Sequence, residues 1–173
     1  MTAIRTELVG QEATEALGAA LAAVLGPGDV LALVGPLGAG KTTLVRGLAN
    51  ALDLPPHVPV QSPTFTVCNE YPTRVPVLHV DLYRLGGLEE AEDIGLPERF
   101  ADGRTLAVIE WADRVPGLIP EHALWVRLEH APSARHVTLA EGGGADVSWA
   151  RDLPGPAEGT TWTTIDAPMP WDS

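Results

Sequence analysis

The sequence predicts an α/β fold with a mostly parallel central sheet, flanked by helices and bordered by antiparallel edge strands. Two continuous apolar segments, Val30–Val34 and 105–109, are typical of strands buried on both faces. The first leads through a glycine-rich loop into segment 42–52, whose apolar residues recur at helical spacing. A chain of 173 residues suits one domain with its own core, and we assign residues 1–140 to that domain.

The other elements follow from periodicity and from turn residues. Helical spacing of apolar residues predicts a helix over 11–25, which Gly26-Pro27-Gly28 ends. β-Branched, aromatic or alternating apolar residues predict the strands, and short polar segments predict the last helices. In chain order we expect a loop over 53–59, strands over 64–71 and 77–83, helices over Leu88–Asp93 and 97–100, and an antiparallel pair of strands near an edge over 124–128 and 136–139.

The glycine-rich loop matches the phosphate-binding motif G-x-x-x-x-G-K-[ST]. Its glycines allow consecutive backbone N–H groups to converge on an anion, and its lysine supplies a mobile ammonium group. The hydroxyl after the lysine is placed to bind magnesium. Strand, loop and helix in this order predict a fold like that of the P-loop NTPases and a bound nucleoside triphosphate. The candidate binding residues are Gly35, Pro36, Leu37, Gly38, Ala39, Gly40, Lys41, Thr42 and Thr43, and Lys41 is the only lysine in the chain.

Two carboxylates at predicted strand ends are candidate catalytic and metal-binding groups. Asp81 lies near the end of segment 77–83, and Glu110 follows the apolar segment 105–109. In a parallel sheet the carboxyl ends of the strands face the ligand. Hydrolysis of a phosphate chain needs a carboxylate for magnesium and a group that positions the nucleophile. We expect Asp81 and Glu110 to supply these roles together with Lys41, and the residues alone leave open which carboxylate has which role.

Ser62-Pro63-Thr64-Phe65 lies between the first helix after the loop and the next carboxylate strand. A hydroxyl group there could sense the γ-phosphate through the metal. Serine and threonine beside proline are equally common in simple turns, so both readings stay open. Because Lys41 is the only lysine, the [N/T]-K-x-D segment that reads guanine is absent, which favours adenine.

The composition limits the class of partner. The formal net charge is −12 and the sequence pI is about 4.6, so no basic stripe is available to grip DNA or RNA directly. No segment approaches the roughly 18 consecutive apolar residues of a membrane span. The first ten residues do not resemble a secretory signal, and Cys68 is the only cysteine. We therefore expect a cytoplasmic protein, and we expect residues 141–173, rich in glycine, proline and tryptophan, to form an irregular C-terminal extension.

Several motifs in this order closely resemble the bacterial TsaE (YjeE) proteins. They are the phosphate loop with its trailing Thr42-Thr43, then Ser62-Pro63-Thr64-Phe65-Thr66-Val67, then His79-x-Asp81-Leu82-Tyr83-Arg84, and finally Val108-Ile109-Glu110-Trp111. The similarity covers about residues 11–139. Two features depart from the family pattern: Pro36 follows the first glycine of the loop, and the extension after Glu141 has no counterpart that we can align.

The resemblance implies a small ATPase that is required for threonylcarbamoyl modification of adenosine 37 in tRNA. It implies binding of ATP with Mg²⁺, and action within a complex of tRNA threonylcarbamoyl transferase subunits, where hydrolysis resets the complex and tRNA is met only indirectly. By position, Thr42 and Glu110 would hold magnesium, Asp81 would be the required carboxylate and Thr64 the switch threonine. Trp111 would lie near the nucleotide or the partner surface, and Thr14 and Arg135 would lie near the adenine pocket.

Two alternatives remain beside an ATP-hydrolysing enzyme. One is a nucleotide-dependent binding switch with negligible catalysis. The other is a small-molecule kinase, which commonly needs an arginine-rich lid over its second substrate. The arginines between Arg74 and Arg114 are scattered rather than clustered, which weakens this reading. No arginine stands out as a finger that would stabilise the transition state in cis, so slow hydrolysis by the isolated chain is expected.

Overall fold

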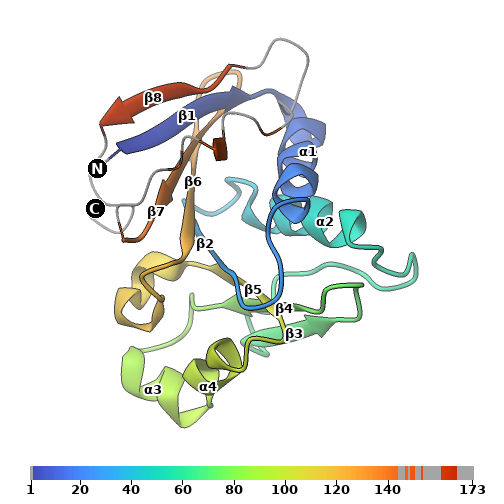
Figure 1. The fold of residues 1–173 in the computed structure, drawn as a ribbon, viewed down its shortest axis with the longest axis vertical. Coiled ribbons are helices and arrows are strands. Elements are labelled where there is room, and N and C mark those ends of the chain that lie inside the picture. The colour runs from blue at the N-terminus through green and yellow to red at the C-terminus, as the bar shows by residue number, and fades with distance from the viewer. Residues whose placement is uncertain (1, 144–146, 148, 151–152, 154–160, 167–173) are drawn as a thin grey trace.

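The protein is a sheet of eight strands with helices on both faces (Figure 1). The computed structural model describes residues 2–143, 147, 149–150, 153 and 161–166. The strand order across the sheet is β3-β4-β5-β2-β6-β7-β1-β8. The strands are β1 (Thr2–Leu8), β2 (Val30–Val34), β3 (Cys68–Tyr71), β4 (Val77–Asp81), β5 (Leu106–Glu110), β6 (Leu124–His130), β7 (Arg135–Glu141) and β8 (Thr163–Asp166).

The sheet is mixed, and only its centre is parallel. Strands β4, β5, β2 and β6 run parallel to one another, whereas β3, β7, β1 and β8 pair antiparallel with their neighbours. The expectation of a mostly parallel sheet therefore holds for the centre alone. Every residue of β2, β4 and β5 is buried, which explains why the central strands include continuous apolar runs instead of alternating ones.

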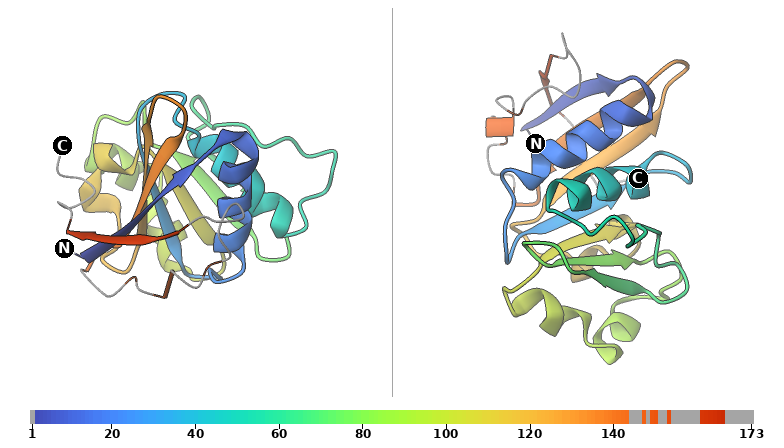
Figure 2. Two further views of the ribbon diagram at one scale, coloured as in Figure 1. Left: turned by 90° about the horizontal axis from the view of Figure 1, so that it is seen from above. Right: turned by 90° about the vertical axis from the view of Figure 1, so that its right-hand side faces the viewer.

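Two layers of helices cover the two faces of this sheet, as Figure 2 shows. Helices α1 (Gly10–Ala22) and α2 (Lys41–Ala51) lie side by side on one face and bury the larger apolar cluster. The other face is covered by α3 (Leu88–Asp93), α4 (Leu96–Ala101) and the 3₁₀ turns η1 (Ala112–Arg114) and η2 (Pro116–Leu118), which bury a second cluster. None of the described helices has the length and apolar character needed to cross a bilayer.

Some boundaries differ from those expected. The strand predicted over 64–71 begins only at Cys68, because a turn closed by the Val67 N–H on the Pro63 carbonyl (2.7 Å) occupies its first half. The strand predicted over 77–83 ends at Asp81, whose carboxylate accepts a hydrogen bond from the Tyr83 N–H (2.8 Å) and turns the chain. The first helix begins at Gly10 and ends at Ala22, earlier than expected.

Strands β1 and β8 were not expected from the sequence. They lie outside β7, so the predicted antiparallel pair, which the structure forms as β6 and β7, is not at the sheet edge. Strand β8 falls within the stretch for which we expected irregular structure, and it pairs with β1. Val147, Ala150 and Leu153 of the same stretch are buried in the larger apolar cluster. The rest of that expectation, including Trp171, lies outside the described residues.

Candidate functional site

The loop between β2 and α2 has a backbone shape that only glycine can adopt at its first position. Gly35 has φ +146°, and a Cβ atom there would lie 2.2 Å from the carbonyl oxygen of Leu128 in β6. The loop is therefore packed against the neighbouring strand without room for a side chain. This packing fixes where the following helix begins.

The N-terminus of α2 is free of the groups that usually neutralise a helix start. Its N-cap, Gly40, makes no side-chain cap, and the first turn contains no acidic residue. The N–H groups of a first helical turn have no partner within the helix, and the helix dipole adds partial positive charge there. Such a helix start is suited to binding a phosphate group.

Lys41 is the first residue of α2, and its ammonium group is folded back on the loop. Its Nζ atom donates to the carbonyl oxygens of Gly35 (2.6 Å) and Pro36 (3.0 Å), and it lies 3.9 Å from the centre of the Trp111 ring. Lys41 is only 5% exposed. Burial lowers the pKa of Lys41 below its ordinary value of 10.5, although the nearby carboxylates of Glu110, Asp81 and Asp113 act in the opposite direction.

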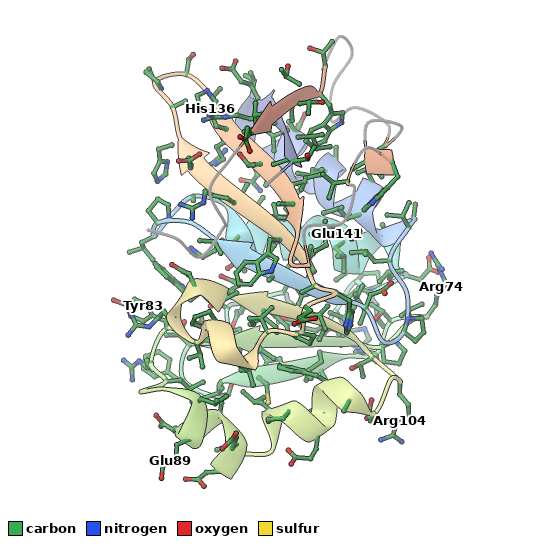
Figure 3. The ribbon with its side chains drawn as sticks, turned by 60° about the vertical axis from the view of Figure 1, so that its left-hand side comes forward. Arg74, Tyr83, Glu89, Arg104, His136 and Glu141 are labelled. Atoms are coloured by element: carbon green, nitrogen blue, oxygen red, sulfur yellow. The ribbon has the colours of Figure 1, made fainter. Side chains whose placement is uncertain are left out.

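The two predicted carboxylates lie side by side. Asp81 at the end of β4 is paired in register with Glu110 at the end of β5, and each is 2% exposed. Arg74 and Arg104, which precede β4 and β5, lie on the opposite side of the molecule from Tyr83, which follows β4 (Figure 3). Both acids are therefore at the carboxyl edge of the parallel strands, as expected.

Glu110 is connected to the start of α2. Its Oε1 atom accepts hydrogen bonds from the Thr42 hydroxyl (2.9 Å) and from His79 Nε2 (2.8 Å). The same oxygen thus joins the phosphate-loop helix to the neighbouring strand β4. The backbone adds a further tie, because the Leu82 N–H donates to the Glu110 carbonyl (3.1 Å).

Asp81 is connected to the Ser62–Thr64 segment instead. Its Oδ2 atom accepts hydrogen bonds from the hydroxyls of Ser62 and Thr64, the latter at 3.1 Å. Its Oδ1 atom accepts from the Tyr83 N–H. The two carboxylates therefore have different neighbours: Glu110 is next to the hydroxyl of the phosphate-loop helix, and Asp81 holds the candidate switch segment.

These groups surround one cavity of about 330 Å³. Of the other predicted residues, Gly35 and Pro36 accept hydrogen bonds from Lys41, whereas Ala39 and Thr14 are buried behind the loop. The Thr14 methyl group and the Arg135 guanidinium lie 3.4 and 3.3 Å from where a Cβ of Gly40 would be. The cavity lining consists of Leu37, Gly38, Gly40, Lys41, Thr42, Thr43, Ser62, Thr64, Asp81, Tyr83, Glu110, Trp111 and Arg135.

Sequence reasoning gave only weak support for placing Arg135 in this site. It comes from β7, and its Nε atom is buried with no hydrogen-bond partner among the described residues. A buried donor of this kind favours an acceptor from a ligand in the cavity. Trp111 also lines the cavity and has a left-handed backbone, φ +59°, directly after Glu110.

Two side chains of this region were given no role from the sequence. Tyr83 lines the cavity, and His79 donates a hydrogen bond to Glu110; Ser62 lines the cavity too, as one of the two hydroxyls of the candidate segment. Each belongs to a motif quoted above, but the spacing alone did not show that their side chains converge. Among the described residues, no cluster of three or more His, Cys, Asp or Glu side chains is suited to a metal. One hydroxyl with one or two carboxylates fits magnesium, which takes its remaining ligands from phosphate and water.

Comparison with known proteins places the chain among relatives. The sequence profile of the family described as "Threonylcarbamoyl adenosine biosynthesis protein TsaE" matches residues 8–137. The tRNA threonylcarbamoyladenosine biosynthesis protein TsaE of Bacillus subtilis is 39% identical over 132 residues, which cover 76% of this chain and 80% of the relative. The protein of the same name from Streptomyces coelicolor is 39% identical over 143 residues, covering 78% and 92%.

A solved structure agrees with the sequence matches. The crystal structure of YdiB from Bacillus subtilis superimposes with a TM-score of 0.67 and 33% sequence identity, covering 80% of this chain and 86% of that one. The likeness therefore extends over both the sequence and the fold. The chain belongs to the TsaE family.

Proposed function

We propose that the protein binds ATP with Mg²⁺ and hydrolyses the γ-phosphate as a component of the machinery that makes threonylcarbamoyladenosine in tRNA. One observation carries the proposal. The open start of α2, the Lys41 ammonium, the Thr42 hydroxyl and the carboxylates of Asp81 and Glu110 face one cavity. Such a set of groups matches the phosphate chain of a nucleotide with its metal. A fold of the P-loop NTPase type is part of this proposal.

The arrangement favours separate roles for the two acids. Thr42 and Glu110 are already in contact, so they are the residues that would hold magnesium, which neutralises charge on the β- and γ-phosphates when bound. Asp81 instead accepts hydrogen bonds from the hydroxyls of Ser62 and Thr64. Its carboxylate, with the Thr64 hydroxyl, would orient the attacking water.

The reaction consumes one water for each ATP. The water oxygen attacks the γ-phosphorus in line, and the bond to the oxygen that bridges the β- and γ-phosphates breaks. ADP and inorganic phosphate leave, and the proton released from water goes to solvent. Lys41 exchanges its bonds to Gly35 and Pro36 for phosphate oxygens and, with the N–H groups of α2, stabilises the developing charge.

The acidity of the chain fits a role inside an assembly. With a net charge of −12, the protein would contact tRNA only through partner subunits that transfer threonylcarbamoyl. Arg135 is the arginine of the cavity lining, and its place beside Gly40 suits the nucleoside or α-phosphate. Among the described residues, the lining thus offers no second arginine for the γ-phosphate, which predicts slow hydrolysis without partners. We propose that hydrolysis resets the transferase complex in the cytoplasm.

A binding switch without significant catalysis is the second candidate. It is favoured by the hydrogen bonds between Asp81 and the Ser62–Thr64 segment, because a carboxylate occupied by a loop can order that loop without activating water. The two candidates differ in the consequence of removing this carboxylate: turnover is lost in the first and unchanged in the second.

The test compares Lys41→Ala, Asp81→Asn and Glu110→Gln with the parent chain, with Glu89→Gln as a control on the exposed surface of α3 (Figure 3). Phosphate release and ATP affinity are measured with and without the transferase subunits. We expect Lys41→Ala to weaken ATP binding at least tenfold. Asp81→Asn should lower turnover about 100-fold or more with nearly unchanged affinity. Undiminished ATP affinity in Lys41→Ala would overturn the binding proposal, and unchanged turnover in Asp81→Asn would favour the switch.

A further inference from the structure

His79 is a buried polar residue to which the proposed reaction gives no role. It lies in the middle of β4 and is 0% exposed. Its Nε2 atom is 2.8 Å from Glu110 Oε1, and its Nδ1 atom is 3.1 Å from the hydroxyl of Tyr71. Because an ionised carboxylate only accepts, Nε2 donates to Glu110 and the imidazole is fixed from both ends.

Tyr71 extends this connection to the loop that carries Ser62 and Thr64. Because its single proton goes to His79 Nδ1, its hydroxyl oxygen accepts from the Gln61 N–H (3.4 Å), and it lies 3.2 Å from the Gln61 carbonyl oxygen. Tyr71 itself is buried at the end of β3, and the centroid of its ring lies 5.8 Å from the centroid of the His79 imidazole. A row of side chains thus runs from the Gln61 backbone through Tyr71 and His79 to Glu110.

Segment 61–64 is consequently attached to both carboxylates. Ser62 and Thr64 bind Asp81 directly, and Gln61 reaches Glu110 through Tyr71 and His79. A fully buried imidazole needs a partner for each of its two nitrogens, so the identity of the partners carries the argument. Here both nitrogens are used, and one of the two paths ends on the proposed magnesium ligand.

We propose that Tyr71 and His79 are positioning residues that couple the orientation of the Glu110 carboxylate to the backbone position of segment 61–64. A displacement of this segment would then change both carboxylates together, one through Ser62 and Thr64 and the other through the imidazole. This inference rests on the proposed function, since it gives Glu110 its role toward magnesium. Neither residue lines the nucleotide cavity itself, so their effect is indirect.

The physical basis is the orientation of a ligand by its outer partners. Groups that hold a metal-binding carboxylate in place commonly change metal affinity by about 10- to 100-fold when they are removed. Without the Tyr71 hydroxyl, the imidazole loses its anchor on the Gln61 side, and Glu110 can rotate away from the Thr42 hydroxyl. The effect is therefore expected on the magnesium-dependent part of nucleotide binding.

The decisive variant is Tyr71→Phe, which keeps the ring and removes only the hydroxyl. Binding of a non-hydrolysable ATP analogue is titrated in EDTA and then at increasing Mg²⁺ concentration. We expect unchanged affinity in EDTA and an increase of about tenfold in the Mg²⁺ concentration that gives half of the metal-dependent gain. His79→Gln keeps a donor for Glu110, so it should raise this Mg²⁺ concentration less than His79→Ala does.

Two further measurements separate positioning from folding. Thr73→Val removes a buried hydroxyl whose acceptors are the backbone carbonyls of Val75 (2.6 Å) and Tyr71 (3.3 Å), and it leaves the Tyr71 hydroxyl and the imidazole in place. It should lower the melting temperature and leave the Mg²⁺ dependence unchanged. In a Glu110→Gln background, Tyr71→Phe should cause no further change in Mg²⁺ dependence, because its effect is transmitted through that carboxylate.

The possible results are distinct. If Tyr71→Phe and His79→Gln behave like Thr73→Val, with lower stability and parental Mg²⁺ dependence, Tyr71 and His79 are structural and the inference is wrong. If the parent chain itself binds the analogue without any gain from Mg²⁺, the proposed function fails, and the inference fails with it. A shift that persists fully in the Glu110→Gln background would also overturn the inference, because the path would not pass through Glu110.

Discussion

The Lys41 ammonium group is hydrogen-bonded to the backbone of its own loop. The carbonyl oxygens of Gly35 and Pro36 accept hydrogen bonds from the ammonium group, but burial still lowers the pKa of Lys41 below 10.5. A triphosphate would reverse this effect, because negative charge at close range favours the protonated form. The proposed nucleotide binding would therefore be linked to the protonation of this residue.

This linkage predicts proton uptake on binding. Between the lowered pKa of the free protein and the higher pKa of the complex, ATP binding should take up a proton, so affinity should fall as pH rises through this window. Calorimetry in two buffers of different ionisation enthalpy measures the uptake directly. Lys41→Arg is the control. Because arginine stays charged, this variant should lose the part of the proton uptake that comes from Lys41. Equal uptake in both proteins would contradict the prediction.

The same shift affects folding of the free protein in a defined direction. The folded state releases the Lys41 proton at a lower pH than the unfolded chain, so the unfolded state binds more protons in the window below 10.5. The contribution of Lys41 to stability therefore rises with pH across that window. Denaturation of Lys41→Met at the same pH values would lack this contribution.

At the scale of single residues, local motifs were readable and distant contacts were not. The loop from Gly35 to Thr42 and the acid at Glu110 were predicted because each is a short contiguous pattern. Most residues of this loop line the same cavity as Glu110, together with Asp81, Thr64, Trp111 and Arg135. The contact between His79 and Glu110 joins residues 31 positions apart, so it depends on the register of β4 and β5, which no local pattern reveals.

At the scale of elements, α1 and α2 approach each other through two glycines. A Cβ atom on Gly18 would lie 2.2 Å from the carbonyl oxygen of Leu44, and one on Gly47 would lie 2.0 Å from the carbonyl oxygen of Glu15. Both obstacles are backbone atoms, so a side chain cannot be accommodated by a rotamer change. The close contact sets the position of α2 and therefore of the cavity.

Replacing Gly18 by alanine should separate the two helices. We expect a loss of about 1–3 kcal/mol in the free energy of unfolding, because overpacking forces a backbone shift. Urea denaturation measures it. Gly26→Ala is the matched control, since a Cβ atom at Gly26 meets nothing within 4 Å, and it should change stability by no more than about 0.5 kcal/mol. Equal stability of both variants would show that the helix contact is not tight.

Element prediction succeeded where hydrophobic patterns were strong. The central strands are continuous apolar runs, and α2 follows its glycine loop, so both were found. Strand β1 has the mixed sequence Thr2–Leu8 with polar side chains between apolar ones, and β8 is mostly exposed with three polar residues in four. Neither sequence shows a strong strand pattern, so pairing with neighbouring strands determines that these segments become strands.

At the scale of the whole molecule, the last described strand closes the sheet over β1. Strand β8 pairs with Thr2–Arg5, and the Thr6 hydroxyl donates to the Thr161 carbonyl (3.0 Å). The cavity lies mainly at the other half of the sheet, around β2, β4 and β5, and Arg135 of β7 completes its lining. The family match ends at residue 137, so this closure is a feature of the chain outside the matched region.

Removing residues 161–173 should therefore affect stability and association but not the cavity. The uncovered edge of β1 presents unpaired backbone groups, which favour pairing with another chain. We expect a lower melting temperature and concentration-dependent association, measured by light scattering, with ATP affinity within about twofold of the parent. A chain that ends at Asp166 keeps β8 and is the reference. A large loss of ATP affinity in the shorter chain would show that the extension supports the site.

Trp111 provides the protein with an optical probe of its own. Its indole is the tryptophan ring of the cavity lining, in contact with the Lys41 ammonium at 3.9 Å and 4.9 Å from the Tyr83 ring centre. When the ammonium turns to a phosphate, the electric field on the indole changes, and so should its fluorescence. Rapid mixing could then follow occupancy on the millisecond scale without any attached dye.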